Sequence, residues 1–291
     1  MALLDRTAQR LLERLHLRVR PKSTSSDQGG QRSNVRANGL EFAERREYVN
    51  GDDARKIDWK AFARNRSLSV RTYEEERDVR VYVLVDVSKS MTRGAPPKLE
   101  VARRIAASFG YLGMNQVERV QVIPFTDSVE RATPIMRRKD DYPALETFLT
   151  SLDARGVTTF AETARSFLQR FPARGYVVVV SDLMEAADWD ASVRMLAQRG
   201  HQLCLMRVRC DEDYAPDFHG EIELSDAETG ETLRVTVTHA LLEAYREEIT
   251  AHVNRVRDAC RRVGGRLVDA PVELPFDQLL RQVLAPALEH A

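Results

Sequence analysis

Short apolar runs that alternate with longer segments of helical periodicity constrain the fold of this chain most. Residues 79–86, 119–125, 176–181 and 201–208 have the length and the β-branched composition of buried strands. Segments with apolar residues at helical spacing separate them, and this alternation is typical of a parallel sheet with helices on both faces. The sequence therefore predicts an α/β, doubly wound, Rossmann-like and mostly parallel sheet.

The predicted helices lie between these strands and after the last of them. Helical spacing covers residues 99–115, 140–152, 160–171, 189–198 and 240–263, and a short strand at 266–270 and a closing helix at 276–288 follow. The stretch "GEIELSDAETGETLRVTV", residues 220–237, breaks this rhythm because two alternating runs flank a turn at 228–231. It predicts a β-hairpin inserted near residues 220–238.

Two N-terminal segments precede the predicted core domain, residues 79–291. Residues 1–38 combine an amphipathic helix, with Leu4, Leu11, Leu12 and Leu15 on one face, and a polar linker. We expect this helix to dock on its own domain, although a helix for a membrane surface or a partner fits the same pattern. Residues 39–78 are dense in charge but carry aromatics, which predicts an arm packed on the core.

Charge and cysteine usage limit the classes of partner and the cellular location. Lys plus Arg and Asp plus Glu number 44 each, so net charge favours a protein or small ligand over nucleic acid. Cys204, Cys210 and Cys260 form no CxxC pair, which is typical of free thiols in a reducing cytoplasm. No apolar run approaches the roughly 18–20 residues that span a bilayer. We expect a cytoplasmic protein without an integral membrane segment.

The run "VRVYVLVDVSKSM" carries the clearest chemistry. Asp86 ends the first core strand, and Ser88 and Ser90 follow at alternate positions. Ligands of open parallel sheets bind beyond the carboxyl ends of the strands, and one carboxylate with several hydroxyls suits Mg²⁺ or Mn²⁺. Two further strand or helix ends offer oxygen donors, "GVTTF", with Thr158 or Thr159, and "VVVVSDLM", with Asp182.

This set of residues resembles a known site. Asp86-x-Ser88-x-Ser90, Thr158 and Asp182 resemble the metal-ion-dependent adhesion site of von Willebrand factor type A domains. The preceding stretch "GLEFAERREYVNGDDARKIDWKAFARNRSLSVRTYEEERD" resembles the bacterial domain-of-unknown-function 58 family, in which such an arm precedes a type A domain. The likeness extends from about Gly39 to the C-terminus.

The resemblance implies a binding function. Mg²⁺ or Mn²⁺ would be surrounded by Asp86, Ser88, Ser90, Thr158 and Asp182, and the last Asp often acts through water. An acidic side chain of a partner protein would complete the coordination of the metal. Such a site binds and does not catalyse. Members of this family are often encoded beside MoxR-type AAA+ ATPases, so the resemblance implies such an ATPase or its client as partner, in protein maturation or complex assembly.

Two other interpretations stay open from the residues alone. Ser88 and Ser90 could cap the next helix or satisfy turn amides, which would leave a metal-free structural scaffold. Asp86 could instead be the nucleophile of a Mg²⁺-dependent phospho-aspartyl phosphatase or phosphotransfer enzyme. Haloacid-dehalogenase phosphatases need a second Asp two residues on, where this chain has Ser88. The sequence therefore favours a protein that is not an enzyme.

Overall fold

The computed structural model divides the chain into two compact units, one of residues 1–20 with 79–291 and one of residues 21–78. It describes residues 2–15, 40–48, 59, 62–63, 68–75, 80–116, 118–185, 189–216, 218–226 and 232–284. In the smaller unit, β1 (Leu40–Glu47) and β2 (Ser69–Glu75) pair antiparallel, with a bulge between Phe42 and Glu44. The polar linker predicted after the first helix lies outside the described residues.

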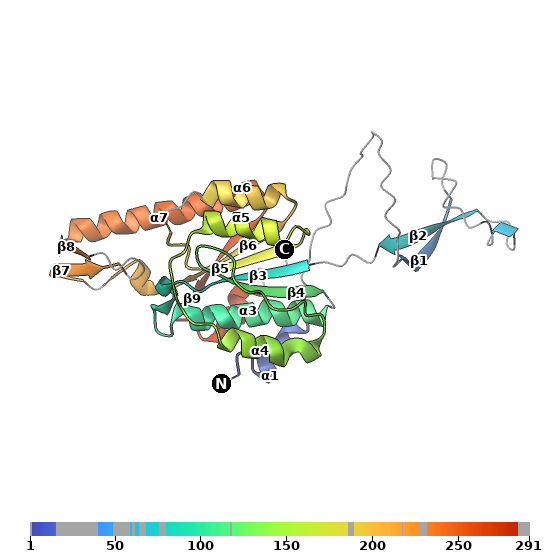
Figure 1. Ribbon diagram of the computed structural model, residues 1–291, viewed down its shortest axis with the longest axis horizontal. Coiled ribbons are helices and arrows are strands. Elements are labelled where there is room, and N and C mark those ends of the chain that lie inside the picture. Colours follow the sequence, from blue (N-terminus) through green and yellow to red (C-terminus); the bar gives the residue numbers. More distant parts are fainter. Residues whose placement is uncertain are drawn as a thin grey trace. The chain divides into compact units, whose positions relative to one another are not determined.

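The larger unit is built on a five-stranded parallel sheet (Figure 1). Its order is β4-β3-β5-β6-β9, and the strands are β3 (Arg80–Asp86), β4 (Arg119–Phe125), β5 (Tyr176–Ser181), β6 (Gln202–Arg209) and β9 (Arg266–Pro271). The chain starts at β3, adds β4 on one side and then reverses to add β5, β6 and β9 on the other. This order confirms the doubly wound α/β fold and places the topological switch point between β3 and β5.

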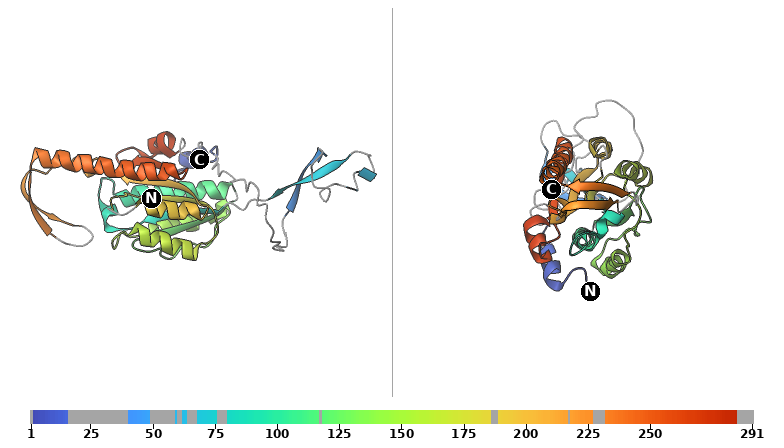
Figure 2. Two further views of the ribbon diagram at one scale, coloured as in Figure 1. Left: turned by 90° about the horizontal axis from the view of Figure 1, so that it is seen from above. Right: turned by 90° about the vertical axis from the view of Figure 1, so that its left-hand side faces the viewer.

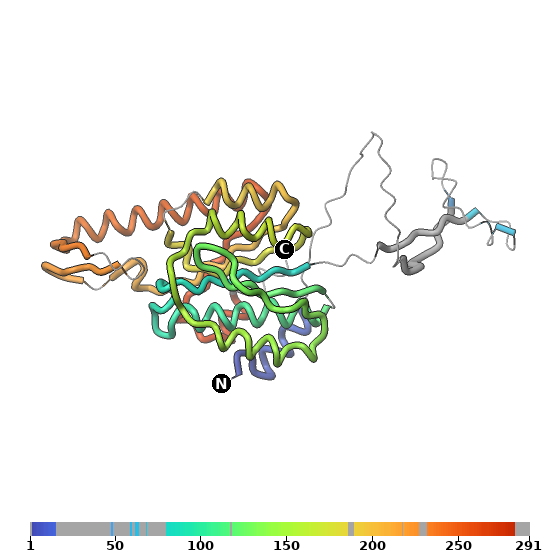
Figure 3. Tube along the Cα trace, viewed as in Figure 1, coloured from blue at the N-terminus to red at the C-terminus, as the bar shows by residue number. Residues whose placement is uncertain are grey.

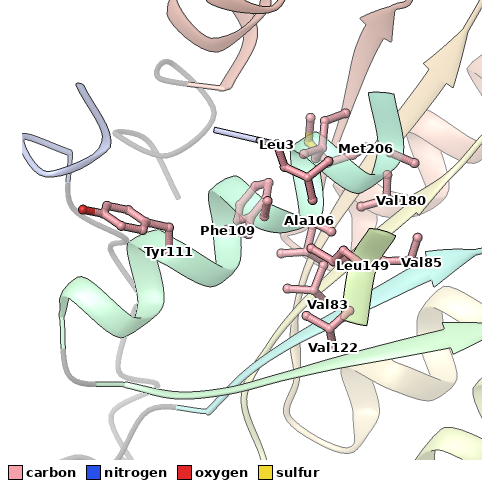
Figure 4. Close-up of a cluster of buried hydrophobic side chains, with 14 of the residues drawn as sticks. Leu3, Val83, Val85, Ala106, Phe109, Tyr111, Val122, Leu149, Val180 and Met206 are labelled. Atoms are coloured by element: carbon pink, nitrogen blue, oxygen red, sulfur yellow. The ribbon is translucent and has the colours of Figure 1, made fainter. Parts of the chain in front are cut away.

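Helices cover both faces of this sheet because its strands are apolar on both faces. In β3, Val81, Val83 and Val85 belong to one core cluster, whereas Tyr82 and Leu84 belong to the other. The first cluster, shown in Figure 4, is completed by α1 (Arg6–Leu12), α3 (Lys98–Asn115), α4 (Tyr142–Thr150) and α8 (Phe276–Leu279). The second is completed by α5 (Phe160–Arg170), α6 (Trp189–Gln198) and α7 (His239–Arg262). Burial on both faces is typical of parallel strands.

The N-terminal helix docks on its own domain. Leu4 and Leu12 are buried in the core cluster that α3 lines. At the ends of this contact, Arg104 Nε donates to the Leu3 carbonyl at 3.1 Å, and Tyr111 Oη donates to Glu13 at 2.9 Å. The apolar face of α1 is therefore used within the chain.

The inserted hairpin follows the carboxyl end of β6. Its strands β7 (Gly220–Ser225) and β8 (Thr232–Val237) pair antiparallel, with Leu224 opposite Leu233, and the predicted turn at 228–231 lies outside the described residues. The first buried residue of α7 is Ile249, ten residues into the helix. Figures 2 and 3 show the hairpin and this first part of α7 extending past the rest of the larger unit.

Two predicted helices differ in detail. The segment predicted as a helix at 140–152 starts as a 3₁₀ turn, Lys139–Asp141, before α4, because Pro143 lacks an N–H and fits only the first turn of an α-helix. The closing helix passes from α8 into a π-helical turn, Leu280–Leu284, and residues 285–288 lie outside the described part.

Among the described helices, none has the length and apolar character to cross a membrane. The three cysteines are buried and free.

Candidate metal centre

Asp86 lies at the carboxyl end of β3 with only 1% of its surface exposed. Its Oδ1 accepts hydrogen bonds from the Ser88 backbone N–H and from Thr158 Oγ1, both at 2.9 Å. Its Oδ2 accepts one from Ser181 Oγ at 2.6 Å. Three donors from three separate segments of the chain therefore hold a carboxylate that would be costly to bury without partners.

The two serines of the motif lie side by side. Ser88 Oγ and Ser90 Oγ are 3.0 Å apart, with Ser88 fully buried and Ser90 half-buried. Ser88 precedes the 3₁₀ turn Lys89–Thr92 in an extended conformation, but its side chain makes no capping hydrogen bond. The structure therefore gives no support to the interpretation of Ser88 as a helix cap.

Backbone contacts bring the Thr158 loop to the Asp86 loop. The Arg155 N–H donates to the Val87 carbonyl at 2.6 Å, and the Lys89 N–H donates to the Gly156 carbonyl at 3.3 Å. Gly156 has φ of +67°, a left-handed conformation that favours glycine. These bonds place Thr158, and not Thr159, against Asp86; Thr159 is the N-cap residue of α5 and makes no side-chain capping bond.

Asp182 follows β5 and has different partners from Asp86. Its Oδ1 accepts from the Met184 N–H at 3.2 Å, and its Oδ2 accepts from Lys98 Nζ at 3.1 Å. The next residue, Leu183, is the non-glycine residue with positive φ among those described, at 56°. A ring nitrogen of His252 bonds the Leu183 carbonyl at 2.8 Å. This strained loop is held from α7, and such strain is common at functional sites.

The electrostatics of the site favour a bound cation. The pKa of Asp86 is raised to about 6, first by burial and then by the negative charge of Asp182, and hydrogen bonds from Ser181 and Ser88 limit the rise. Glu185, which accepts from the Phe160 N–H at 2.8 Å, also has a raised pKa, through burial first and through the charge of Asp86. A nearby positive charge would therefore stabilise this group of carboxylates.

Lys98 is the positive charge that the fold itself supplies. It is buried at the start of α3, and its Nζ contacts Asp182 and Asp213. Burial lowers the pKa of Lys98, but the charges of Asp182 and Asp213 more than compensate, so the pKa lies above its usual value. The ammonium group is therefore charged at neutral pH.

The sequence indicated five residues of the candidate centre and gave no prediction for four others that lie around it. Ser181 bonds Asp86 and Lys98 bonds Asp182, whereas Asp213 bonds Lys98 and Glu185 interacts with the charge of Asp86. Ser181 lies next to Asp182 at the end of an apolar strand, which was a usable signal. The others gave none, because Lys, Asp and Glu are mostly exposed and only tertiary contacts show that these are not.

The donor oxygens fit a small, hard cation. Ligands at adjacent corners of an octahedron with bonds of 2.0–2.1 Å are about 2.9 Å apart. The Thr158–Asp86 and Ser88–Ser90 oxygen pairs are 2.9 and 3.0 Å apart. Within the described ranges, no three His, Cys, Asp or Glu side chains form a metal-binding group. A cation here would therefore depend on hydroxyl ligands, which suit Mg²⁺ or Mn²⁺ better than zinc.

The position of the site agrees with the topology. Asp86 and Ser181 end β3 and β5, the two strands on either side of the switch point. Ligands of doubly wound sheets bind in the crevice outside this point. The residues that the sequence singled out at separate strand ends are thus brought to one edge of the sheet.

Comparison with known proteins relates the chain to uncharacterised bacterial relatives. Proteins of Mycobacterium bovis and Mycobacterium tuberculosis, both uncharacterised, are each 27% identical over 262 residues, which cover 88% of this chain and 82% of the relative. An uncharacterised protein of Mycobacterium avium is 29% identical over 133 residues, 45% of this chain and 78% of the relative.

Several solved structures are similar at low identity. BatB from Bacteroides thetaiotaomicron has a TM-score of 0.37 and 17% identity, covering 60% of this chain and 99% of that one. An aerotolerance-related membrane protein from Bacteroides fragilis has a TM-score of 0.44 and 17% identity, and the match covers 73% of this chain and 98% of that one. The SpRpn10 VWA domain has a TM-score of 0.40 and 12% identity, and the match covers 72% of this chain and 97% of that one. The fold assignment rests on the strand order described above.

The family model described as "Protein of unknown function DUF58" matches residues 44–257. This match extends from β1 into α7 and so includes β3, β5 and every residue of the candidate centre. The chain therefore belongs to the DUF58 family.

Proposed function

We propose that this chain is a non-enzymatic protein-binding module. Asp86, Ser88, Ser90 and Thr158, with Asp182 nearby, hold Mg²⁺ or Mn²⁺ at the edge of the sheet, and a carboxylate of a partner protein completes the site. The observation that carries the proposal is the cluster around Asp86, where a buried carboxylate and hydroxyls from separate loops converge.

The residues of the chain divide the work of binding. Asp86 supplies the negative charge, and its burial excludes the water that would otherwise screen that charge. The hydroxyls of Ser88, Ser90 and Thr158 are neutral and can turn their lone pairs outward. When bound, the cation supplies a Lewis-acidic position that an external carboxylate can fill. A site with few charged ligands keeps a net attraction for an anion.

A protein partner suits the surface near this edge. The hairpin that follows β6 leaves apolar side chains exposed, 64% of Leu233 and 38% of Leu224, and Leu241 and Tyr245 of α7 are exposed as well. Leu224 and Leu233 are partners across the hairpin, and exposed apolar side chains that lie together mark interaction surfaces. Within the DUF58 family, a MoxR-type AAA+ ATPase or its client is the partner that we propose to test first, with a role in protein maturation or complex assembly.

The enclosure of Asp86 supports binding over phosphoryl transfer. Both carboxylate oxygens accept hydrogen bonds and the side chain is almost wholly buried. A nucleophile needs an oxygen that can approach phosphorus in line. Incubation with acetyl phosphate should therefore leave the protein unphosphorylated, and turnover that disappears in Asp86→Ala would refute a non-enzymatic role.

Affinity capture tests the proposed function. The tagged chain is incubated with native lysate in Mg²⁺, in EDTA, and in Mg²⁺ as the Asp86→Ala variant. We expect a partner in the first condition that is lost in the other two. Asp127→Ala is the matched control, because Asp127 is an exposed carboxylate after β4 at the same edge and is not a proposed ligand. Partner bands that are the same in every condition would sink the metal-bridged mechanism.

A further inference from the structure

Lys98 is the least expected charged residue of the domain, because it is 1% exposed. A lysine is almost never fully buried unless its charge is paired. Its Nζ donates to Asp182 Oδ2 at 3.1 Å and to Asp213 Oδ1 at 2.8 Å. Both carboxylates are themselves buried, with 4% and 7% exposure. The three side chains form an enclosed ion triad.

The triad joins three segments next to the candidate centre. Lys98 opens α3, Asp182 follows β5, and Asp213 lies in the 3₁₀ turn Asp211–Asp213 after β6. Asp213 Oδ2 also accepts from the Cys210 N–H at 3.0 Å, so this carboxylate is fixed independently of Lys98. Asp213, in the turn that precedes the inserted hairpin, is therefore a fixed second acceptor for the Lys98 ammonium group.

The partners of Asp86 and Asp182 differ in a way that matters for a cation. Side-chain hydroxyls bond Asp86, and a hydroxyl that donates to a carboxylate also has lone pairs for a metal. An ammonium group bonds Asp182, and it has no lone pair and repels a cation. Each carboxylate also accepts from one backbone N–H, Asp86 from Ser88 and Asp182 from Met184, so the difference lies in their side-chain partners. The two carboxylates are therefore not equivalent.

We propose that Lys98 neutralises Asp182 and keeps it out of direct coordination, so that Asp86 is the single charged ligand that the chain gives the centre. This inference rests on the proposed function and specifies its partner chemistry. Lys98 also pairs with Asp213, so the triad keeps one negative charge, but Asp86 is then the one carboxylate in contact with the cation. A divalent cation together with that single charged ligand retains a positive charge. Such a centre prefers an anionic partner group, a carboxylate, over a neutral amide or hydroxyl.

A purely structural role for Lys98 makes the opposite prediction. If the triad only stabilises the fold, removing Lys98 leaves two buried carboxylates unpaired and loosens the site, so cation binding weakens. If Lys98 neutralises Asp182, removing it frees a second carboxylate for the cation, so binding tightens. The direction of the change in affinity therefore separates the two roles.

The experiment is calorimetric titration of the full chain with Mn²⁺. We expect Lys98→Met and Lys98→Gln to bind Mn²⁺ more tightly than wild type, by the 10–100-fold that groups behind metal ligands typically contribute. Adding Asp182→Asn to Lys98→Met should return the affinity close to the wild-type value. Lys89→Gln is the matched control, because Lys89 is an exposed lysine between Ser88 and Ser90, and its loss should change affinity little.

Stability without metal gives a second readout. Lys98→Met should unfold at a lower temperature than wild type in EDTA and recover more of that loss when Mn²⁺ is added, because the cation replaces the missing charge. Lys98→Gln keeps an amide that can donate to one carboxylate, so it carries the test if Lys98→Met does not fold.

Each outcome has one meaning. If folded Lys98 variants bind Mn²⁺ with the wild-type affinity or more weakly, the inference about Lys98 is overturned. The proposed function still stands in that case, provided that wild type binds Mn²⁺ and that this binding depends on Asp86. Absence of Mn²⁺ binding by wild type overturns both. Asp182→Asn alone provides a test that does not need a Lys98 variant: it should lower affinity far less than Asp86→Asn, and an equal loss would show that Asp182 is a direct ligand.

Discussion

Replacing Thr158 by valine isolates one hydrogen bond of the candidate centre. Valine has nearly the shape of threonine, so the substitution removes the hydroxyl that donates to Asp86 Oδ1 at 2.9 Å without opening a cavity. Asp86 is 1% exposed, so water does not readily replace the lost donor. The metal-free protein should therefore lose stability.

The size of the loss follows from the charge of the acceptor. A hydrogen bond to a charged group contributes about 1.5–3 kcal/mol. Two donors, the Ser88 N–H and Ser181 Oγ, stay on Asp86, so we expect about 2 kcal/mol. For a domain of this size, that lowers the melting temperature by about 4–8 °C.

Urea unfolding in EDTA measures this effect, with Thr159→Val as the matched control. Thr159 is the adjacent residue, is extended, and makes no side-chain capping bond, so its replacement should cost less than about 0.5 kcal/mol. A double-mutant cycle with Asp86→Asn should give a coupling energy above about 1 kcal/mol between positions 86 and 158. Equal losses for the two valine variants, or no coupling, would refute the assignment of Thr158 to Asp86.

Three further predictions concern other parts of the larger unit. Burial lowers the pKa of His201 to about 4, so as the pH falls the unfolded chain takes up a proton before the folded chain does. The stability that is present above about pH 6.5 therefore declines as the pH falls towards 4. Urea titrations should show that wild type loses about 2.5 kcal/mol more than His201→Phe between pH 7 and 4.5. Gly156→Ala should cost about 1 kcal/mol, because φ is +67° there, and should weaken Mn²⁺ binding in calorimetry; unchanged binding would contradict the role of this turn. Leu233→Glu, at a 64% exposed position, should leave the melting temperature unchanged but reduce partner capture, and capture equal to wild type would remove the hairpin from the interface.

The elements of the fold were predictable because their signals are local. The strands at 119–125 and 176–181 lie where the sequence placed them, because both segments are short and rich in β-branched residues, which favours a strand over a helix. The start of the last helix at Phe276 was also predicted, but its change into a π-helical turn after Leu279 was not, because that turn depends on packing and not on periodicity.

The candidate site was predictable only where a strand ends in a polar residue. Asp86 and Ser88 follow an apolar run, and the parallel sheet then brings them to the edge where Thr158 lies. Lys98 had no such signal, because a lysine at a helix start is usually solvated, and only the fold shows it enclosed between two carboxylates. Buried ion pairs between segments far apart in sequence leave no periodic trace.

The most direct measurement is a crystal structure grown or soaked in MnCl₂, with anomalous diffraction data that locate manganese. We predict one peak at the edge of the sheet, about 2.0–2.3 Å from oxygens of Asp86, Ser88, Ser90 and Thr158, with Asp182 still bonded to Lys98 and not touching the metal. An ordered structure with no peak at Asp86, or with manganese bound elsewhere, would contradict the account.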